Sequence, residues 1–198
     1  MPRPFLLAAA LFTVSLLLLP AGVQAAAAPA QYRVRFDTSC GAFVVNILRA
    51  EAPHGADRLY DLVKHHFFDG ARFFRVVPGF VVQWGYPADA AVLNKWHTAI
   101  PDDPVRASNT RGTITYAATS EPNSRSTQLF INYGNNTRLD SLGFAPLGKV
   151  VSGMAVVDHI YFGYGESPDQ SLIAQAGNTY LNRVFPKLDY IKTARVVK

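Results

Sequence analysis

Apolar stretches beyond residue 31 are short, and turn-forming residues separate them. The clearest case is FFRVVPGFVVQWG, Phe73 to Gly85, where Pro78-Gly79 divides two apolar runs. A Pro-Gly pair turns the chain and interrupts a strand ladder, so this stretch predicts two short strands, 73–77 and 80–85. Arg75 is the single charged residue in the stretch, and its presence there requires an explanation.

The same pattern predicts six further strands. Residues 32–48 alternate apolar and polar positions on either side of Cys40-Gly41, which is typical of a hairpin or of two neighbouring antiparallel strands. Four more strands are predicted at 112–118, 128–132, 147–151 and 188–197.

Two helices are expected. Residues 52–67 carry apolar side chains at spacings of three and four after Pro53, and a shorter helix is predicted at 154–160. Residues 86–110 predict a long loop, and 162–186 predict an irregular tail rich in Gly, Pro, Asn and Gln. The pattern favours a mainly β fold class: a closed eight-stranded antiparallel β-barrel capped by two α-helices.

The N-terminus has the pattern of a secretory signal peptide, residues 1–25. It has a basic start at Arg3, an apolar run, and small residues before a cleavage point expected near Ala25. The apolar run is about 15 residues long, shorter than the ~20 that a membrane-spanning helix needs, so a permanent anchor is the weaker interpretation. We expect residues 26–31 to form a flexible leader and 32–198 to form one domain.

These features predict an exported protein without stable membrane insertion after cleavage. A periplasm is the favoured location and secretion is the alternative. A eukaryotic secretory lumen is less favoured because the chain lacks a retention tail.

Composition excludes several functional classes. The formal charge of +5 falls to +4 without Arg3, and no Lys/Arg block exceeds two residues, so nucleic acid is not an expected partner. Cys40 is the only cysteine, which excludes an internal disulfide, and the five histidines form no metal motif. We expect no metal and no cofactor. An enzyme without acid/base machinery and a binding protein remain as hypotheses.

Five segments together resemble the cyclophilin-type peptidyl-prolyl cis-trans isomerases. In chain order they are FDGARFFRVVPGFVVQWG, NTRGTITYA, EPNSRSTQLFIN, LDSLGFAPLGKV and VSGMAVVDHI, and the resemblance extends from about Tyr32 to Val197. It implies the cyclophilin-like barrel with two capping helices and catalysis of cis/trans isomerisation at X-Pro bonds. The barrel predicted from the strand pattern agrees with this fold.

The resemblance also assigns site residues. Arg75 corresponds to the family's catalytic arginine, and Gln83 and Gln128 to glutamines that bind the substrate backbone or hold the arginine. The remaining expected substrate-binding residues are the apolar wall around the proline ring, two residues of a peptide-pairing strand and one rim residue: Phe80, Val81, Phe130, Leu139, Ala117, Ala118 and Phe144. Without the resemblance, an arginine in a strand is ordinarily a surface residue and these aromatics are ordinarily core.

The chain departs from the family pattern at five positions. Phe74 stands where His is common, and we expect its side chain to point away from the reacting bond. Val81 in place of Met predicts a shallower proline pocket, and Trp84 in place of a glycine predicts a reshaped strand end. Arg138 stands where some members have Trp, and Phe144 where a polar rim residue is usual.

Two hypotheses follow from the resemblance and its departures. The first is a peptidyl-prolyl isomerase that acts on X-Pro bonds of unfolded or flexible exported polypeptides, where slow proline steps limit folding. The second is a proline-peptide binding or holdase module on the same barrel, in which Val81, Trp84 and Phe144 have weakened turnover. A carbohydrate-binding barrel is a more remote alternative. The sequence leaves the oligomeric state open.

Overall fold

Two long strands begin the fold of residues 27–198, the part of the chain that the computed structural model describes. β1 (Gln31–Thr38) and β2 (Gly41–Leu48) form an antiparallel hairpin. Alternate side chains of both strands are buried, and the rings of Phe36 and Phe43 stack with their centroids 4.9 Å apart. The hairpin predicted from the alternation at 32–48 is therefore confirmed.

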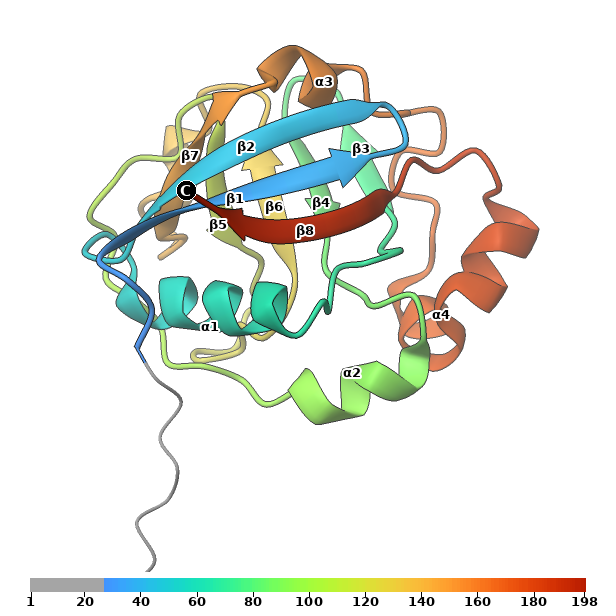
Figure 1. Ribbon diagram of the computed structural model, residues 1–198, viewed down its shortest axis with the longest axis horizontal. Coiled ribbons are helices and arrows are strands. Elements are labelled where there is room, and N and C mark those ends of the chain that lie inside the picture. The colour runs from blue at the N-terminus through green and yellow to red at the C-terminus, as the bar shows by residue number, and fades with distance from the viewer. Residues whose placement is uncertain (1–26) are drawn as a thin grey trace, which may run out of the picture.

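The remaining strands complete one antiparallel sheet with the order β3-β4-β6-β5-β7-β2-β1-β8 (Figure 1). All eight predicted strands are present, and several are shorter than predicted. Their bounds are β3 (Arg75–Val77), β4 (Val81–Trp84), β5 (Thr113–Tyr116), β6 (Leu129–Asn132), β7 (Pro146–Ser152) and β8 (Ile191–Val197).

The sheet curls into an open half-barrel, so the expected closure of the barrel is not confirmed. β3 and β8 end the strand order. The residues before β3 meet the start of β8 at one isolated bridge, Arg72 with Tyr190, and through three backbone hydrogen bonds that join residues 70, 71 and 73 to residues 189 and 191. The outward N–H of Val76 on β3 donates instead to the carbonyl of Gly165 at 3.1 Å. Because this contact occupies the free edge of the three-residue strand β3, β3 itself forms no ladder with β8.

The two predicted helices are present and lie on opposite sides of the sheet. α1 (Pro53–Lys64) lies below it in Figure 1 and α3 (Met154–Asp158) above it. α1 buries Leu59, Leu62 and Val63 against the sheet.

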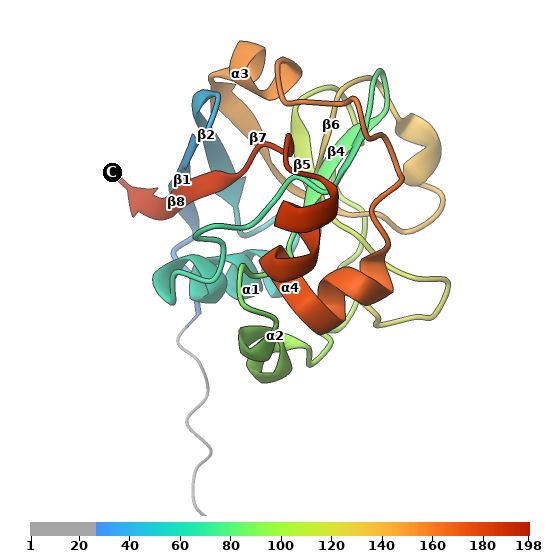
Figure 2. The ribbon, with the colours of Figure 1, turned by 90° about the vertical axis from the view of Figure 1, so that its right-hand side faces the viewer.

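The prediction of two helices in all is wrong, because the described residues contain two more α-helices and one 3-10 helix. These are α2 (Ala90–Trp96), α4 (Gln170–Val184) and η1 (Thr137–Leu139). α2 lies within the predicted loop. It has only seven residues, and Val92, Leu93 and Trp96 are only partly buried against the main core, so its apolar pattern is too short to indicate a helix. α4 is kinked at Gly177, whose φ is +50°. Figures 1 and 2 show α4 beside α2.

A separate small core holds α4 onto the sheet. It contains Phe74, Ile173, Leu181 and Leu188, with Tyr86, Tyr164, Tyr180 and Phe185 packed around them. Phe74 is fully buried here and its ring lies 5.2 Å from that of Tyr86. The main core, by contrast, lies between the sheet and α1.

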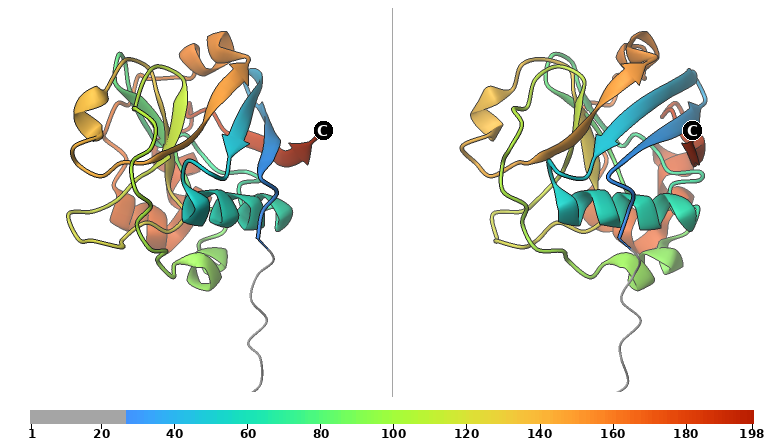
Figure 3. Two further views of the ribbon diagram at one scale, coloured as in Figure 1. Left: turned by 90° about the vertical axis from the view of Figure 1, so that its left-hand side faces the viewer. Right: turned by 60° about the vertical axis from the view of Figure 1, so that its left-hand side comes forward.

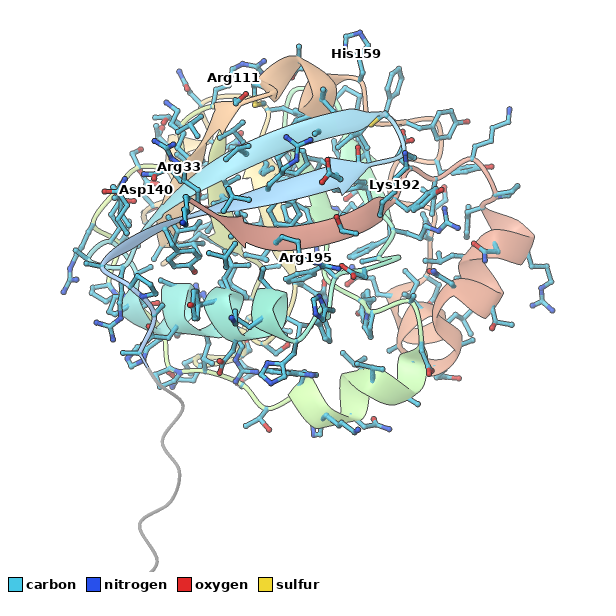
Figure 4. The ribbon with its side chains drawn as sticks, in the orientation of Figure 1. Arg33, Arg111, Asp140, His159, Lys192 and Arg195 are labelled. Carbon is cyan, nitrogen blue, oxygen red and sulfur yellow. The ribbon has the colours of Figure 1, made fainter. Side chains whose placement is uncertain are left out.

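The first described residues contact α1 (Figure 3). Ala28, within the range interpreted as a leader, is buried, and its N–H donates to Oδ1 of Asp57 at 2.8 Å. Arg49 donates two hydrogen bonds to the same carboxylate, from Nε at 2.7 Å and from Nη2 at 2.8 Å. A comparable pair, Arg195 with Asp69, ties β8 to the turn after α1; Arg195 is labelled in Figure 4.

Asp57 is predicted to make stability depend on pH. A hydrogen bond from Arg49 holds the pKa of Asp57 below its ordinary value. Partial burial opposes this shift, and the hydrogen bond from the Ala28 N–H adds to it. A carboxylate with a lowered folded-state pKa contributes stability above its unfolded pKa of about 3.9, and this contribution is lost as pH falls through the folded-state pKa. We expect Asp57→Asn to lower the free energy of unfolding by about 1 kcal/mol at pH 7 and by much less near pH 3, measured by urea titration.

Asp61→Asn is the matched control for this measurement. Asp61 lies on the same helix, and its carboxylate makes no hydrogen bond or ion pair within residues 27–198. A pH-independent loss in Asp57→Asn, or an equal loss in both variants, would contradict the assigned role of the carboxylate.

The predicted signal peptide and its cleavage point lie outside the described residues. Within 27–198, no helix has the length and apolar character required to cross a membrane.

Candidate active site

One groove brings together all ten residues that the sequence nominated. Its cavity volume is about 330 Å³. The nominated residues that line it are Arg75, Phe80, Val81, Gln83, Ala117, Ala118, Gln128, Phe130, Leu139 and Phe144, and the lining is completed by Thr119, Ser124, Ser126 and Gln170.

Strand pairing sets the central row of the groove. Arg75 on β3 is opposite Gln83 on β4, and Gln83 is opposite Phe130 on β6. Side chains of cross-strand partners lie on the same face of a sheet, so three strands present a cation, an amide and an aromatic ring side by side. Alternation along β4 sends Val82 and Trp84 to the opposite face, into the main core.

A polar chain crosses this row. Arg75 Nη1 donates to Gln83 Oε1 at 3.1 Å, and Gln83 Nε2 donates to Gln128 Oε1 at 2.8 Å. Gln83 is only 5 % exposed, so its amide is fixed between the two partners. The guanidinium carbon of Arg75 also lies 5.6 Å from the centre of the Phe80 ring.

The apolar end of the groove is a small cluster of its own. Val81, Phe130 and Leu139 are buried together, with Phe80, Ala117 and Phe144 packed at the margin. Phe130 and Phe144 meet edge to face at 5.9 Å. The cluster forms an apolar pocket immediately beside the Arg75 guanidinium.

A buried asparagine, which the sequence reasoning did not nominate, holds the far wall of this pocket. Asn109 is fully buried; its Nδ2 donates to Asp140 Oδ1 and to the Phe144 carbonyl, both at 2.8 Å, and its Oδ1 accepts from Thr115 Oγ1 at 2.9 Å. Although burial opposes ionisation, hydrogen bonds from Ser108 and Asn109 hold the pKa of Asp140 below its ordinary value. Asp140 is labelled in Figure 4. Asn109 opens the NTRGTITYA segment, so the motif itself was the available signal.

Two arginines border the aromatic rim. Arg138 lies 4.8 Å from the centre of the Phe80 ring, and Arg125 lies 5.6 Å from the centre of the Phe144 ring. Arg125 is in turn paired with Asp102. Two guanidinium groups therefore lie against aromatic rings at the rim of the groove.

The peptide-pairing residues lie just beyond a strand rather than within it. β5 ends at Tyr116, so the predicted strand 112–118 is too long at this end. The N–H of Ala117 donates to the Gln128 carbonyl at 2.9 Å, after which the chain leaves the sheet. The N–H and C=O of Ala118 form no hydrogen bond within residues 27–198, and both remain available to a bound peptide.

The end of β4 is regular, which corrects one expectation. Trp84 pairs with Leu129 in register, so the tryptophan does not reshape the strand. The next residue, Gly85, has φ +132°, and a Cβ there would lie 2.3 Å from the Gln128 Cα. Only glycine allows the chain to pass this close to Gln128.

Glu166 is the contact of Arg75 that sequence reasoning missed. Arg75 Nε donates to Glu166 Oε1 at 2.6 Å, and Nη2 lies 2.5 Å from the same oxygen. The two residues are 91 positions apart, and Glu166 lies in the segment predicted to be irregular. Within 27–198, no three His, Cys, Asp or Glu side chains gather closely enough to hold a metal ion.

Comparison with known proteins gives one consistent family. Residues 33–175 match the model of the cyclophilin type peptidyl-prolyl cis-trans isomerase family. The chain is 38 % identical to peptidyl-prolyl cis-trans isomerase A of Dickeya dadantii over 157 residues, covering 74 % of this chain and 80 % of that protein. It is 35 % identical to a peptidyl-prolyl cis-trans isomerase of Acinetobacter baylyi over 134 residues, covering 64 % and 70 %.

Solved structures show the same fold at lower identity. A cyclophilin from Hirschia baltica, AquaCyp293, aligns with a TM-score of 0.65 at 17 % identity, covering 85 % of this chain and 75 % of that one. A cyclophilin type isomerase from Cryptosporidium parvum aligns with a TM-score of 0.63 at 17 % identity, covering 85 % and 98 %.

Proposed function

This chain belongs to the cyclophilin-type peptidyl-prolyl cis-trans isomerases, and we propose that Arg75 carries its chemistry. In this proposal the groove receives an X-Pro segment, the proline ring enters the apolar pocket, and the guanidinium stabilises the twisted amide. The substrates are X-Pro bonds of unfolded or flexible polypeptides. Neither a metal nor another cofactor takes part in this mechanism.

Twisting the amide creates the need for a fixed donor. Isomerisation breaks no covalent bond, and its barrier of about 18–20 kcal/mol is lost resonance. As resonance is lost, the proline nitrogen becomes basic, so a donor aimed at it stabilises the transition state more than the planar amide. Arginine suits this role because its guanidinium stays charged and presents its donors in a rigid plane.

The row formed by Arg75, Gln83 and Phe130 is the observation that carries this proposal. It sets a guanidinium, 26 % exposed in its side chain, beside a pocket of buried apolar residues. An amide in this groove would lose water on one side and meet a cation on the other. Gln83 is proposed to hold Arg75, and Gln128 and Ala118 to bind the peptide backbone.

Arg75 supplies only part of the required stabilisation. An acceleration of ~10⁵-fold needs about 7 kcal/mol, whereas one preorganised donor to a developing charge supplies about 3–4 kcal/mol. We assign the remainder to desolvation in the apolar pocket and to restraint of one side of the X-Pro bond.

An isomerase assay beside a peptide-binding titration tests this function. We expect the chain from residue 27 to accelerate exchange of a short X-Pro peptide and proline-limited refolding of an unfolded protein. Binding of the peptide without either acceleration would favour the holdase alternative. Of the three departures that suggested a holdase, Trp84 packs in the main core, so only Val81 and Phe144 can act in the groove.

We propose that the natural substrates are exported polypeptides, on the strength of the signal-peptide pattern at residues 1–25. The test is the mass of the N-terminal peptide of the protein recovered from the cell envelope of its host. A chain that begins near Ala26 supports export, and a chain that retains Met1 in the cytoplasmic fraction refutes it.

A further inference from the structure

The Glu166 carboxylate contacts Nε and Nη2 of Arg75, the proposed catalytic arginine. We propose that Glu166 is a positioning residue of the isomerase: it holds the Arg75 guanidinium so that the opposite edge points into the groove. This inference rests on the proposed role of Arg75 and adds a residue from a segment distant in sequence.

The N–H donors of Arg75 support this arrangement, because different edges of the guanidinium have different partners. A guanidinium carries five N–H donors in one plane. Nε and Nη2 meet Glu166 Oε1, at 2.6 and 2.5 Å, and Nη1 meets Gln83 Oε1 at 3.1 Å. Two fixed contacts on different edges define the orientation of a planar group, and the remaining N–H groups have no partner within residues 27–198. Gln83 alone would fix one edge and leave the group free to rotate.

Glu166 acts from outside the substrate site. Its side chain is 62 % exposed, and it does not line the groove. A substrate can therefore bind without displacing it, and its loss is expected to alter turnover rather than binding. Glu166 is for this reason a positioning residue and not a catalytic one.

The residues on both sides of Arg75 hold the segment that carries Glu166. The N–H of Val76 donates to the Gly165 carbonyl at 3.1 Å, and Phe74 is buried in the small core that also receives Tyr164 from this segment. Asp169 then begins α4 by accepting hydrogen bonds from the N–H groups of Ser171 and Leu172. These anchors bring the backbone of Glu166 close to Arg75 independently of the ion pair.

The kinetic experiment compares Glu166→Ala and Glu166→Gln with the wild-type chain on a short X-Pro peptide. We expect Glu166→Ala to lower kcat about tenfold, the order that follows from releasing the rotamers of one arginine, with KM changed less than twofold. Glu166→Gln, which keeps one acceptor, should fall between the two. Glu121→Gln is the charge-matched control on an exposed loop whose residues Thr119 and Ser124 line the groove, and it should leave kcat unchanged.

A spectroscopic readout separates positioning from a merely structural effect. We expect the Arg75 Nε–H signal in a ¹⁵N NMR spectrum, assigned by its loss in Arg75→Lys, to be protected from exchange with water in the wild type. It should be shifted and broadened in Glu166→Ala but not in Glu121→Gln. Thermal unfolding of each variant checks that the fold is retained.

Each result decides the question. An unchanged or raised kcat in Glu166→Ala, or an unprotected Nε–H in the wild type, would overturn the positioning role while Arg75→Ala still tests the proposed function. A wild-type chain without isomerase activity would refute the proposed function and this role together. A rise in KM with constant kcat would place Glu166 in substrate binding instead and would also overturn the proposal.

Discussion

Replacement of Arg75 by alanine is expected to lower kcat/KM for an X-Pro peptide by about 10²- to 10³-fold. Removal of one preorganised donor to a developing charge costs about 3–4 kcal/mol of transition-state stabilisation. The loss should fall mainly on kcat, because the pocket formed by Val81, Phe130 and Leu139 still receives the proline ring. Exchange spectroscopy on the peptide, with unfolding measured in parallel, gives both quantities.

Two further variants sharpen this result. Arg75→Lys keeps the charge but not the planar donors, so an intermediate activity is expected. Arg111→Ala is the matched control, because Arg111 is also an ion-paired arginine, with Asp158 at 2.7 Å, and lies outside the groove. Wild-type activity in Arg75→Ala, or equal losses in Arg75→Ala and Arg111→Ala, would disprove the arginine mechanism.

One side of the groove could be predicted from the sequence because Arg75 and Gln83 lie on short, strongly patterned strands. The Pro78-Gly79 turn and the alternation around it placed Arg75 and Gln83 on facing strands, and the structure pairs them. The resemblance supplied the residues on β6 and η1 that no local pattern identified. All ten nominated residues line one cavity.

The segment that carries Glu166 could not be predicted in the same way. The segment 162–186 is interrupted by glycines and prolines, and its helix α4 contains a left-handed residue at Gly177. Its apolar positions, Ile173 and Leu181 with Gly177 between them, do recur every four residues, which was a usable signal. The ion pair of Glu166 with Arg75 depends on tertiary packing, and no local pattern encodes it.

The expected closure of the barrel is not confirmed, for a related reason. Counting strands does not show which edges meet. The free edge of β3 contacts Gly165, a residue of the same unpredicted segment. The extra segment therefore accounts both for the open edge and for the unexpected partner of Arg75.

Trp84→Ala is expected to cause the largest loss of stability among these variants. Trp84 is fully buried in the main core, where its ring meets Phe36 at 5.7 Å and Phe73 at 5.6 Å, both nearly edge to face. Truncation of a buried tryptophan typically lowers the free energy of unfolding by about 3–5 kcal/mol through lost burial and the cavity left behind. Urea titration of the chain from residue 27 measures this loss.

Trp84→Phe should be far milder, and the reason lies in one atom. Nε1 of Trp84 is buried and has no hydrogen-bond partner within residues 27–198. An unpaired buried donor costs about 1–3 kcal/mol, so its removal offsets much of the packing lost with the smaller ring, and we expect a net change within about 1 kcal/mol. The only other tryptophan, Trp96, is half-buried on α2, and Trp96→Phe is the matched control in which no buried donor is removed. A loss in Trp84→Phe close to that in Trp84→Ala would mean that Nε1 has a partner, such as a buried water. Trp84 would then stabilise the core through a hydrogen bond of Nε1 and not only through apolar packing behind the groove.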